Sequence, residues 1–173
     1  MTVQSVLDDP AAIGTWTLVP DRSSVSFTNK TLWGLVPVNG HFTDISGQGR
    51  LQPGGAVSGR LTIGAASLRT GIGKRDEHLR SADFFDTAAF PEITVEVTGV
   101  RPDGELDATL SVRGTTLAVP LSATIVRVDQ DSVRVTARAH VDRTRWGVSG
   151  NMFGMMPTTT TLTADAVFIK SAS

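Results

Sequence analysis

The sequence has no cysteine and no tyrosine among its 173 residues. Without cysteine there are no disulfides and no thiolate metal sites, so the fold depends on its hydrophobic core. Without thiols and phenols, many nucleophilic and oxyanion-stabilising arrangements are also excluded. A chain of this length can bury a full core as one domain, so no covalent cross-link is needed.

Neither sign of charge is in excess. Sixteen Lys and Arg residues face seventeen Asp and Glu residues, giving a formal net charge of −1. Nucleic acid is therefore not an expected partner, because phosphate contacts need a basic surface. A polybasic membrane anchor is excluded on the same ground.

Long apolar runs are also missing. No stretch approaches the roughly 18 apolar residues of a spanning helix, so we expect no integral membrane segment. Residues 1–10 contain no Lys or Arg and no apolar run, and so do not resemble a secretory signal. These features predict a cytoplasmic protein.

What the sequence has in quantity is alternation of apolar and polar residues, which is typical of half-buried β-strands. In residues 133–142, the five residues Val133, Val135, Ala137, Ala139 and Val141 fall on one face. Similar runs are expected at residues 13–19, 23–31, 35–46, 57–68, 93–98, 106–112, 116–128 and 162–168, separated by turn residues. The spacing predicts an all-β fold, an antiparallel barrel of about eight strands. We expect an N-terminal tail over residues 1–12 and a single domain over 13–170.

One charged segment interrupts the alternation. Residues 69–86 read RTGIGKRDEHLRSADFFD, with Asp76 and Arg80 placed at i and i+4 on a helix, the acid first. We expect one short helix near residues 74–82, docked on the barrel through Phe84, Phe85 and Phe90.

The apolar faces of the strands carry small side chains and no charge. Their alanines are Ala65, Ala108, Ala123, Ala137, Ala139, Ala164 and Ala166. An eight-stranded barrel either fills its interior or keeps a cavity for one small ligand. Alanines facing one another favour an apolar cavity, but small residues also allow two sheets to pack as a solid sandwich, and the pattern alone leaves both open.

Two apolar segments lie in expected loops. Residues 152–156 contain Met152, Phe153, Met155 and Met156, and residues 32–36 contain Leu32, Trp33 and Leu35. The methionine-rich segment can form a flexible gate at the barrel mouth or plug the interior as core. The second segment can form a cavity rim or an apolar turn against the helix.

Catalytic and metal-binding signals are weak. His78 lies beside Asp76, Glu77, Asp83 and Asp86, so a general acid/base pair of His78 and Asp76 or a metal site is conceivable. A solvated helix whose charges pair with one another is the simpler interpretation. No metal-ligand or nucleophile motif occurs elsewhere, so we predict neither a metal nor catalytic residues.

Four segments together resemble the YceI-like family. They are residues 16–27 (WTLVPDRSSVSF), 69–86 with Phe90-Pro91 and Ile93, 114–116 (GTT), and 142–148 (DRTRWGV). The resemblance extends over about residues 13–170. It implies a lipocalin-like, extended antiparallel β-barrel whose elongated apolar pocket holds a polyisoprenoid chain, such as a polyprenyl phosphate or an isoprenoid quinone tail.

The residues and the resemblance together predict non-catalytic binding, storage or transport of a hydrophobic small-molecule lipid. We expect a bound polyisoprenoid, quinone or fatty-acid-like lipid, no resident cofactor, and a homodimer as one possible assembly. The alternatives are an enzyme acting on a bound lipid or quinone through His78 and Asp76, and a ligand-free structural or stress-response protein. The pocket residues we expect are Phe27, Leu32, Trp33, Leu35, Phe84, Phe85, Leu110, Ala123, Ala137, Ala139, Trp146, Met152, Phe153, Met155 and Met156.

Overall fold

A computed structural model describes residues 3–30, 37–148 and 159–171. Its strands are β1 (Gly14–Leu18), β2 (Ser24–Lys30), β3 (Pro37–Phe42), β4 (Ile45–Leu51), β5 (Val57–Gly64), β6 (Leu68–Arg69), β7 (Glu92–Val100), β8 (Leu106–Val112), β9 (Thr115–Ala118), β10 (Ser122–Asp129), β11 (Ser132–Asp142) and β12 (Thr159–Lys170). The helices are α1 (Val3–Leu7) and α2 (Gly73–Arg80), with short 3₁₀ turns η1 (Pro10–Ala12), η2 (Pro20–Arg22), η4 (Ala65–Ser67) and η5 (Arg143–Trp146). The all-β prediction is confirmed.

Alternation along the strands separates an inner from an outer face. In β8, Leu106, Ala108, Leu110 and Val112 are buried, while the residues between them are half-buried. In β11, Ala137 and Ala139 are buried and Arg134, Arg138 and His140 are exposed. Because successive side chains of a strand point to opposite faces, every second residue is delivered to the interior.

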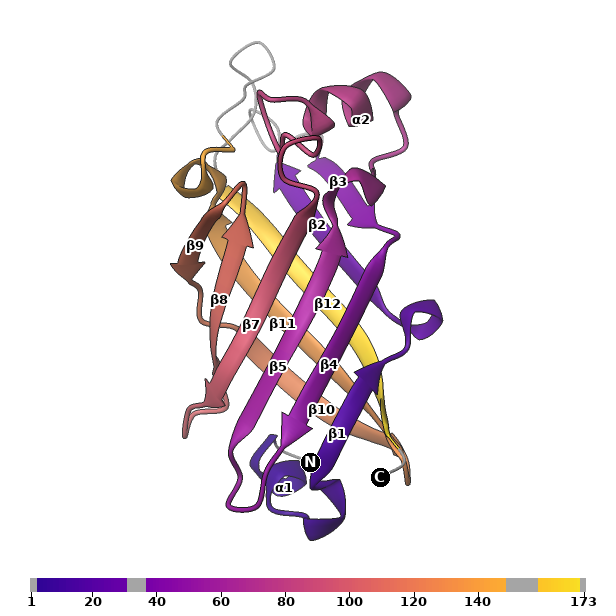
Figure 1. The fold of residues 1–173 in the computed structure, drawn as a ribbon, viewed down its shortest axis with the longest axis vertical. Coiled ribbons are helices and arrows are strands. Elements are labelled where there is room, and N and C mark those ends of the chain that lie inside the picture. The colour runs from indigo at the N-terminus through magenta and orange to yellow at the C-terminus, as the bar shows by residue number, and fades with distance from the viewer. Residues whose placement is uncertain (1–2, 31–36, 149–158, 172–173) are drawn as a thin grey trace.

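All strand pairs are antiparallel, and β12 lies at the centre of the arrangement. It pairs along its length with β11 and, on its other side, with β2 near one end and β1 near the other. From β1 the sheet continues through β4, β5, β7 and β8 to β9. The strands curve around a common axis (Figure 1).

One continuous segment, residues 115–129, connects β8 to β11. Its first part, β9, pairs with β8, and its second part, β10, pairs with β11. Pro120 lies between the two parts and cannot donate a backbone hydrogen bond, and beyond it Leu121 still forms a bridge with Leu106 of β8. This segment therefore forms the part of the barrel wall between β8 and β11. Among the described strands, β8 and β11 do not pair with each other directly.

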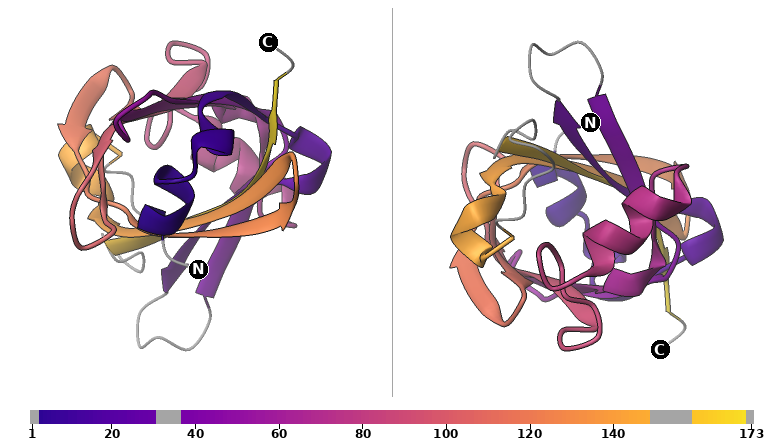
Figure 2. Two further views of the ribbon diagram at one scale, coloured as in Figure 1. Left: turned by 90° about the horizontal axis from the view of Figure 1, so that it is seen from below. Right: turned by 90° about the horizontal axis from the view of Figure 1, so that it is seen from above.

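The two α-helices lie at opposite ends of the barrel (Figures 1 and 2). Leu79 of α2 packs into a large core cluster with Leu68 and Phe84. Val6 of α1 belongs to a second cluster with Trp16 and Val133. The helix expected near residues 74–82 is α2. Within the N-terminal segment expected as a tail, residues 3–7 form α1 and residues 10–12 form η1.

Two strands that the alternation suggests are interrupted by tertiary hydrogen bonds. In the strand expected over residues 35–46, the described part divides into β3 and β4 at Thr43 and Asp44, whose backbone amides donate to the Ser67 hydroxyl. Residues 57–68 end as a strand at Gly64 and turn through η4, where the Ser67 hydroxyl donates to the Gly64 carbonyl. One serine thus holds both turns, and its contact with the distant Thr43 and Asp44 is one that no local pattern reveals.

Candidate functional site: an apolar cavity

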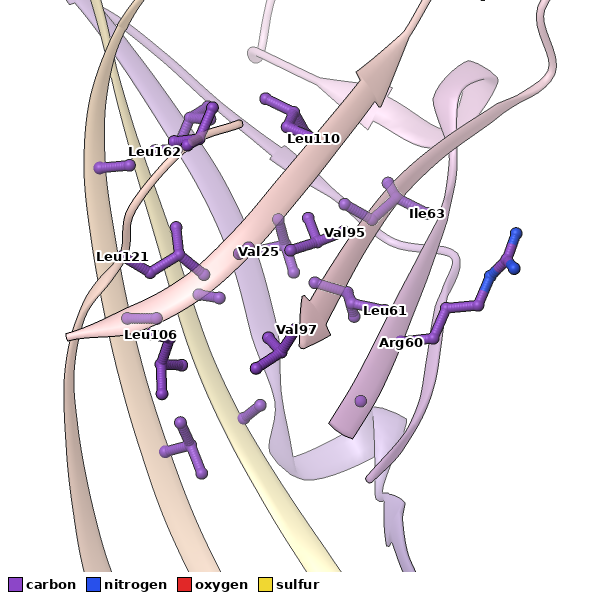
Figure 3. Close-up of a pocket in the computed structure, with 18 of the residues that line it drawn as sticks. Val25, Arg60, Leu61, Ile63, Val95, Val97, Leu106, Leu110, Leu121 and Leu162 are labelled. Carbon is purple, nitrogen blue, oxygen red and sulfur yellow. The ribbon is translucent and has the colours of Figure 1, made fainter. Parts of the chain in front are cut away.

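A cavity of about 300 Å³ extends along the interior of the barrel. Its lining includes Val6 and Leu7 of α1 at one end, Phe84 and Phe85 beyond α2 at the other, and inward residues of the strands between them. Figure 3 shows aliphatic side chains from several strands, among them Val25, Val95, Leu110 and Leu162, gathered around the interior, while Arg60 points away. The structure therefore favours the hollow barrel over the solid sandwich.

Alanines keep the middle of this interior open. Ala108, Ala137, Ala139, Ala164 and Ala166 all line the cavity. Ala137 faces Ala164 across the β11–β12 pair. Because directly opposite residues share one face of a sheet, this pair places two methyl groups where larger side chains would meet.

Aromatic rings pack closely at the α2 end. The rings of Phe27 and Phe42 lie 5.7 Å apart, and Phe85 contacts both, at 6.2 and 6.3 Å. Trp146 is 3% exposed, and its Nε1 donates to the Leu110 carbonyl at 2.9 Å. These tilted and edge-on contacts fix the rings in place, so this end of the cavity has rigid walls.

The same end holds the buried polar side chains of the lining. In the described ranges these are Asn29, Thr160 and Arg143. The Thr160 hydroxyl donates to Asn29 Oδ1 at 2.7 Å, and Arg143 Nη1 donates to the Val148 carbonyl at 2.6 Å. Burial lowers the pKa of the Arg143 guanidinium from its ordinary value, while its charge lies 5.6 Å from the centre of the Phe84 ring.

At the α1 end the buried lining is apolar. It consists of Val6, Ala12, Trp16, Leu51 and Val133. The one N–H donor among these side chains is satisfied, because Trp16 Nε1 donates to the Ala12 carbonyl at 2.8 Å. Among the buried residues of the lining, polar side chains thus lie at one end only.

Seven of the expected pocket residues meet around the cavity: Phe27, Phe84, Phe85, Leu110, Ala137, Ala139 and Trp146. Ala123 is half-buried on β10 and is not in the lining, although its Cα pairs with that of Ala137. Leu32, Trp33, Leu35, Met152, Phe153, Met155 and Met156 lie outside the described residues. Val6 and Leu7 were not anticipated, but the spacing of Val3, Val6 and Leu7 is a helical signal that could have revealed them.

The acid/base pair considered for α2 does not form around the cavity. The Asp76 carboxylate accepts hydrogen bonds from the amide of Thr70, at 2.9 Å, and from its hydroxyl. His78 Nε2 lies 3.3 Å from Asp83 Oδ2, with the His78 side chain 37% exposed. Neither His78 nor Asp76 lines the cavity. Asp76 therefore stabilises the start of α2.

The described ranges contain neither a metal-binding cluster nor a membrane-spanning helix. Nowhere in these ranges do three or more His, Asp or Glu side chains gather as a metal would require. Of the helices described here, neither has the length and apolar character needed to cross a bilayer.

The fold and the cavity together define a class, an all-β barrel with an apolar interior and one α-helix at each end. Residues 16–169 match the family model of the YceI-like domain. The chain belongs to the YceI-like family.

Sequence relatives and solved structures agree with this assignment. Over 74 residues the chain is 43% identical to YceI of Shigella sonnei and 40% identical to YceI of Salmonella arizonae. Each match covers 41% of this chain and 39% of the relative. The matched segment is thus well under half of the curated relatives' length.

The fold is similar to that of BcnA from Burkholderia cenocepacia, with a TM-score of 0.76, 21% identity, and coverage of 87% of this chain and 98% of that chain. It is also similar to a polyisoprenoid-binding domain from Saccharophagus degradans, with a TM-score of 0.75, 18% identity, and coverage of 90% and 98%. The predicted lipocalin-like barrel is therefore the fold of this family.

Proposed function

We propose that this protein binds a polyisoprenoid or similar long-chain lipid in the barrel cavity, for storage or transport and without catalysis. The observation that carries the proposal is an interior lined almost throughout by aliphatic and aromatic side chains. The fold shared with a polyisoprenoid-binding domain supports it.

The energetics favour a flexible hydrocarbon tail as guest. Burying one CH₂ group contributes about 0.8 kcal/mol, so a five-carbon isoprene unit contributes about 4 kcal/mol before ordering costs. A polar guest would lose its hydrogen bonds to water along most of the interior, because so little of the lining can replace them. A polyprenyl phosphate and an isoprenoid quinone both present such a tail.

Native mass spectrometry of the purified protein tests the proposal. We expect adducts with the mass of a lipid, recovered by organic extraction, and uptake of added geranylgeraniol after delipidation. A delipidated, folded protein that takes up no geranylgeraniol would contradict the proposal.

Ala137→Trp locates the site. Ala137 is 7% exposed and lines the cavity, so an indole there fills the space that a tail would take. We expect uptake to fall at least about tenfold, since several buried CH₂ groups are displaced. The matched control is Arg138→Trp, which adds the same ring to the next, exposed residue of β11 and should leave uptake unchanged. Equal uptake by the two folded variants would contradict an interior site.

A further inference from the structure

The helix α1 and the turn η1 lie across the end of the barrel opposite α2 (Figure 2). Val6 is 6% exposed and Leu7 is half-buried, and both line the cavity. Ala12 of η1 is 1% exposed and lines it as well. The base of the cavity is therefore made by these first turns of the chain and not by the strands alone.

Side-chain hydrogen bonds fasten this segment to three strands. Trp16 Nε1 of β1 donates to the Ala12 carbonyl, and Lys170 Nζ of β12 donates to the Ala11 carbonyl at 2.6 Å. Arg127 of β10 forms an ion pair with Asp9 at 2.8 Å. These interactions hold η1 and Asp9 before it, while α1 packs on the barrel through Val6 and Leu7, so the two turns together form a floor.

The distribution of polar groups orients an amphiphilic guest. Asn29, Thr160 and Arg143 lie at the α2 end, and the buried lining near α1 offers no comparable polar group. A polar group of the guest therefore finds buried hydrogen-bonding partners only near α2. The hydrocarbon tail consequently runs toward α1.

The length of the interior is finite. Val133 and Val141 of β11 line its two ends and are eight residues apart. At the rise of a β-strand they lie about 26 Å apart along the strand, or about 20 Å along the axis of a barrel with tilted strands. A tail longer than this interval meets α1.

We propose that α1 is a specificity-determining floor, whose Val6 and Leu7 set the longest tail that the cavity accepts. This inference rests on the proposed function, since it concerns the same cavity and the same class of lipid. Up to the floor, each added isoprene unit buries more apolar surface and tightens binding by at least about tenfold. Beyond the floor, further units gain nothing.

A series of polyprenols tests the inference. Geraniol, farnesol, geranylgeraniol and solanesol are titrated into delipidated protein, with bound ligand measured by native mass spectrometry. In the wild type we expect affinity to rise along the series and then to level or fall. Deletion of residues 2–8 removes α1 and keeps the Asp9–Arg127 ion pair, so affinity should continue to rise to solanesol.

Two smaller changes keep the test valid if the deletion unfolds the protein. The break point is the tail length at which affinity stops rising. Leu7→Ala shortens a side chain of the floor and should move the break point toward longer tails, whereas Ala12→Phe adds a ring to the floor and should move it toward shorter ones. Val126→Ala is the control, because Val126 is 54% exposed and does not line the cavity.

The outcomes separate the two proposals. If the wild type binds tails and all α1 variants keep its break point, the role of α1 is overturned while lipid binding stands. If the wild type takes up none of the four polyprenols, the proposed function itself fails, and α1 has no tail to limit.

Discussion

At the residue scale, the shape of the cavity depends on where side chains are absent as much as on where they are present. Gly40 of β3 is the register partner of Phe27 of β2. A Cβ built on Gly40 would overlap the Phe27 ring, which lies directly over the glycine. Phe27 can therefore line the cavity and pack on Phe42 and Phe85 only because its neighbour has no side chain.

Gly40→Ala should destabilise the protein by about 1–3 kcal/mol, since the added methyl displaces a ring from a packed aromatic group. The matched control is Gly73→Ala at the start of α2, where nothing lies within 4 Å of the added Cβ. It should be neutral or slightly stabilising, because alanine is the better helix former. Urea unfolding measures both, and equal stabilities of the two variants would contradict the tight packing at Gly40.

At the element scale, the charged segment that contains α2 joins the helix to the barrel. Arg80 donates to the carbonyls of Ala66 and Leu68, at 3.0 and 2.9 Å. Arg75 donates to the Thr70 hydroxyl and carbonyl, both at 2.9 Å. The charged side chains of this segment raised the hypothesis of a catalytic or metal site. Its two arginines instead donate hydrogen bonds that join the helix to the end of the barrel.

Asp76→Ala should destabilise the protein by about 1–3 kcal/mol, because the half-buried Thr70 amide and hydroxyl lose their acceptor. Asp76→Asn keeps one acceptor oxygen and should cost less. Exposed Glu77 supplies the control, since Glu77→Ala should change stability by no more than about 0.5 kcal/mol. The measurement is the midpoint of urea unfolding. A folded Asp76→Ala variant as stable as the wild type would rule out this role of Asp76.

Particular elements show what the sequence can and cannot predict. Period-2 alternation located β7, β8, β11 and β12, most clearly β8, in which every second residue is buried. It missed α1, because five residues give little more than one helical turn of pattern, and this helix is stabilised by packing on the barrel. It placed Ala123 on the same face as Ala137, and the two are register partners. It did not show that the strand expected over residues 116–128 divides into β9 and β10, of which β10 among the described strands pairs with β11 alone.

At the scale of the whole molecule, a wall of antiparallel strands encloses an apolar interior between two helical ends. Because the strands alternate, one residue in two faces inward, and these inward residues make the interior apolar. The alanines of β8, β11 and β12 leave it hollow. The buried polar groups near α2 and the floor at α1 make the two ends of the cavity different, so a guest with one polar end binds in one orientation. One architecture thus accounts for what the cavity accepts and how its guest lies.

A crystal structure of the protein co-crystallised with geranylgeraniol tests the central claim most directly. We predict continuous density for the chain inside the barrel, passing Ala137 and Ala139, with its hydroxyl toward α2 and its last isoprene unit against Val6 and Leu7. Density confined to the outer surface, with the interior closed by rearranged side chains, would contradict the account.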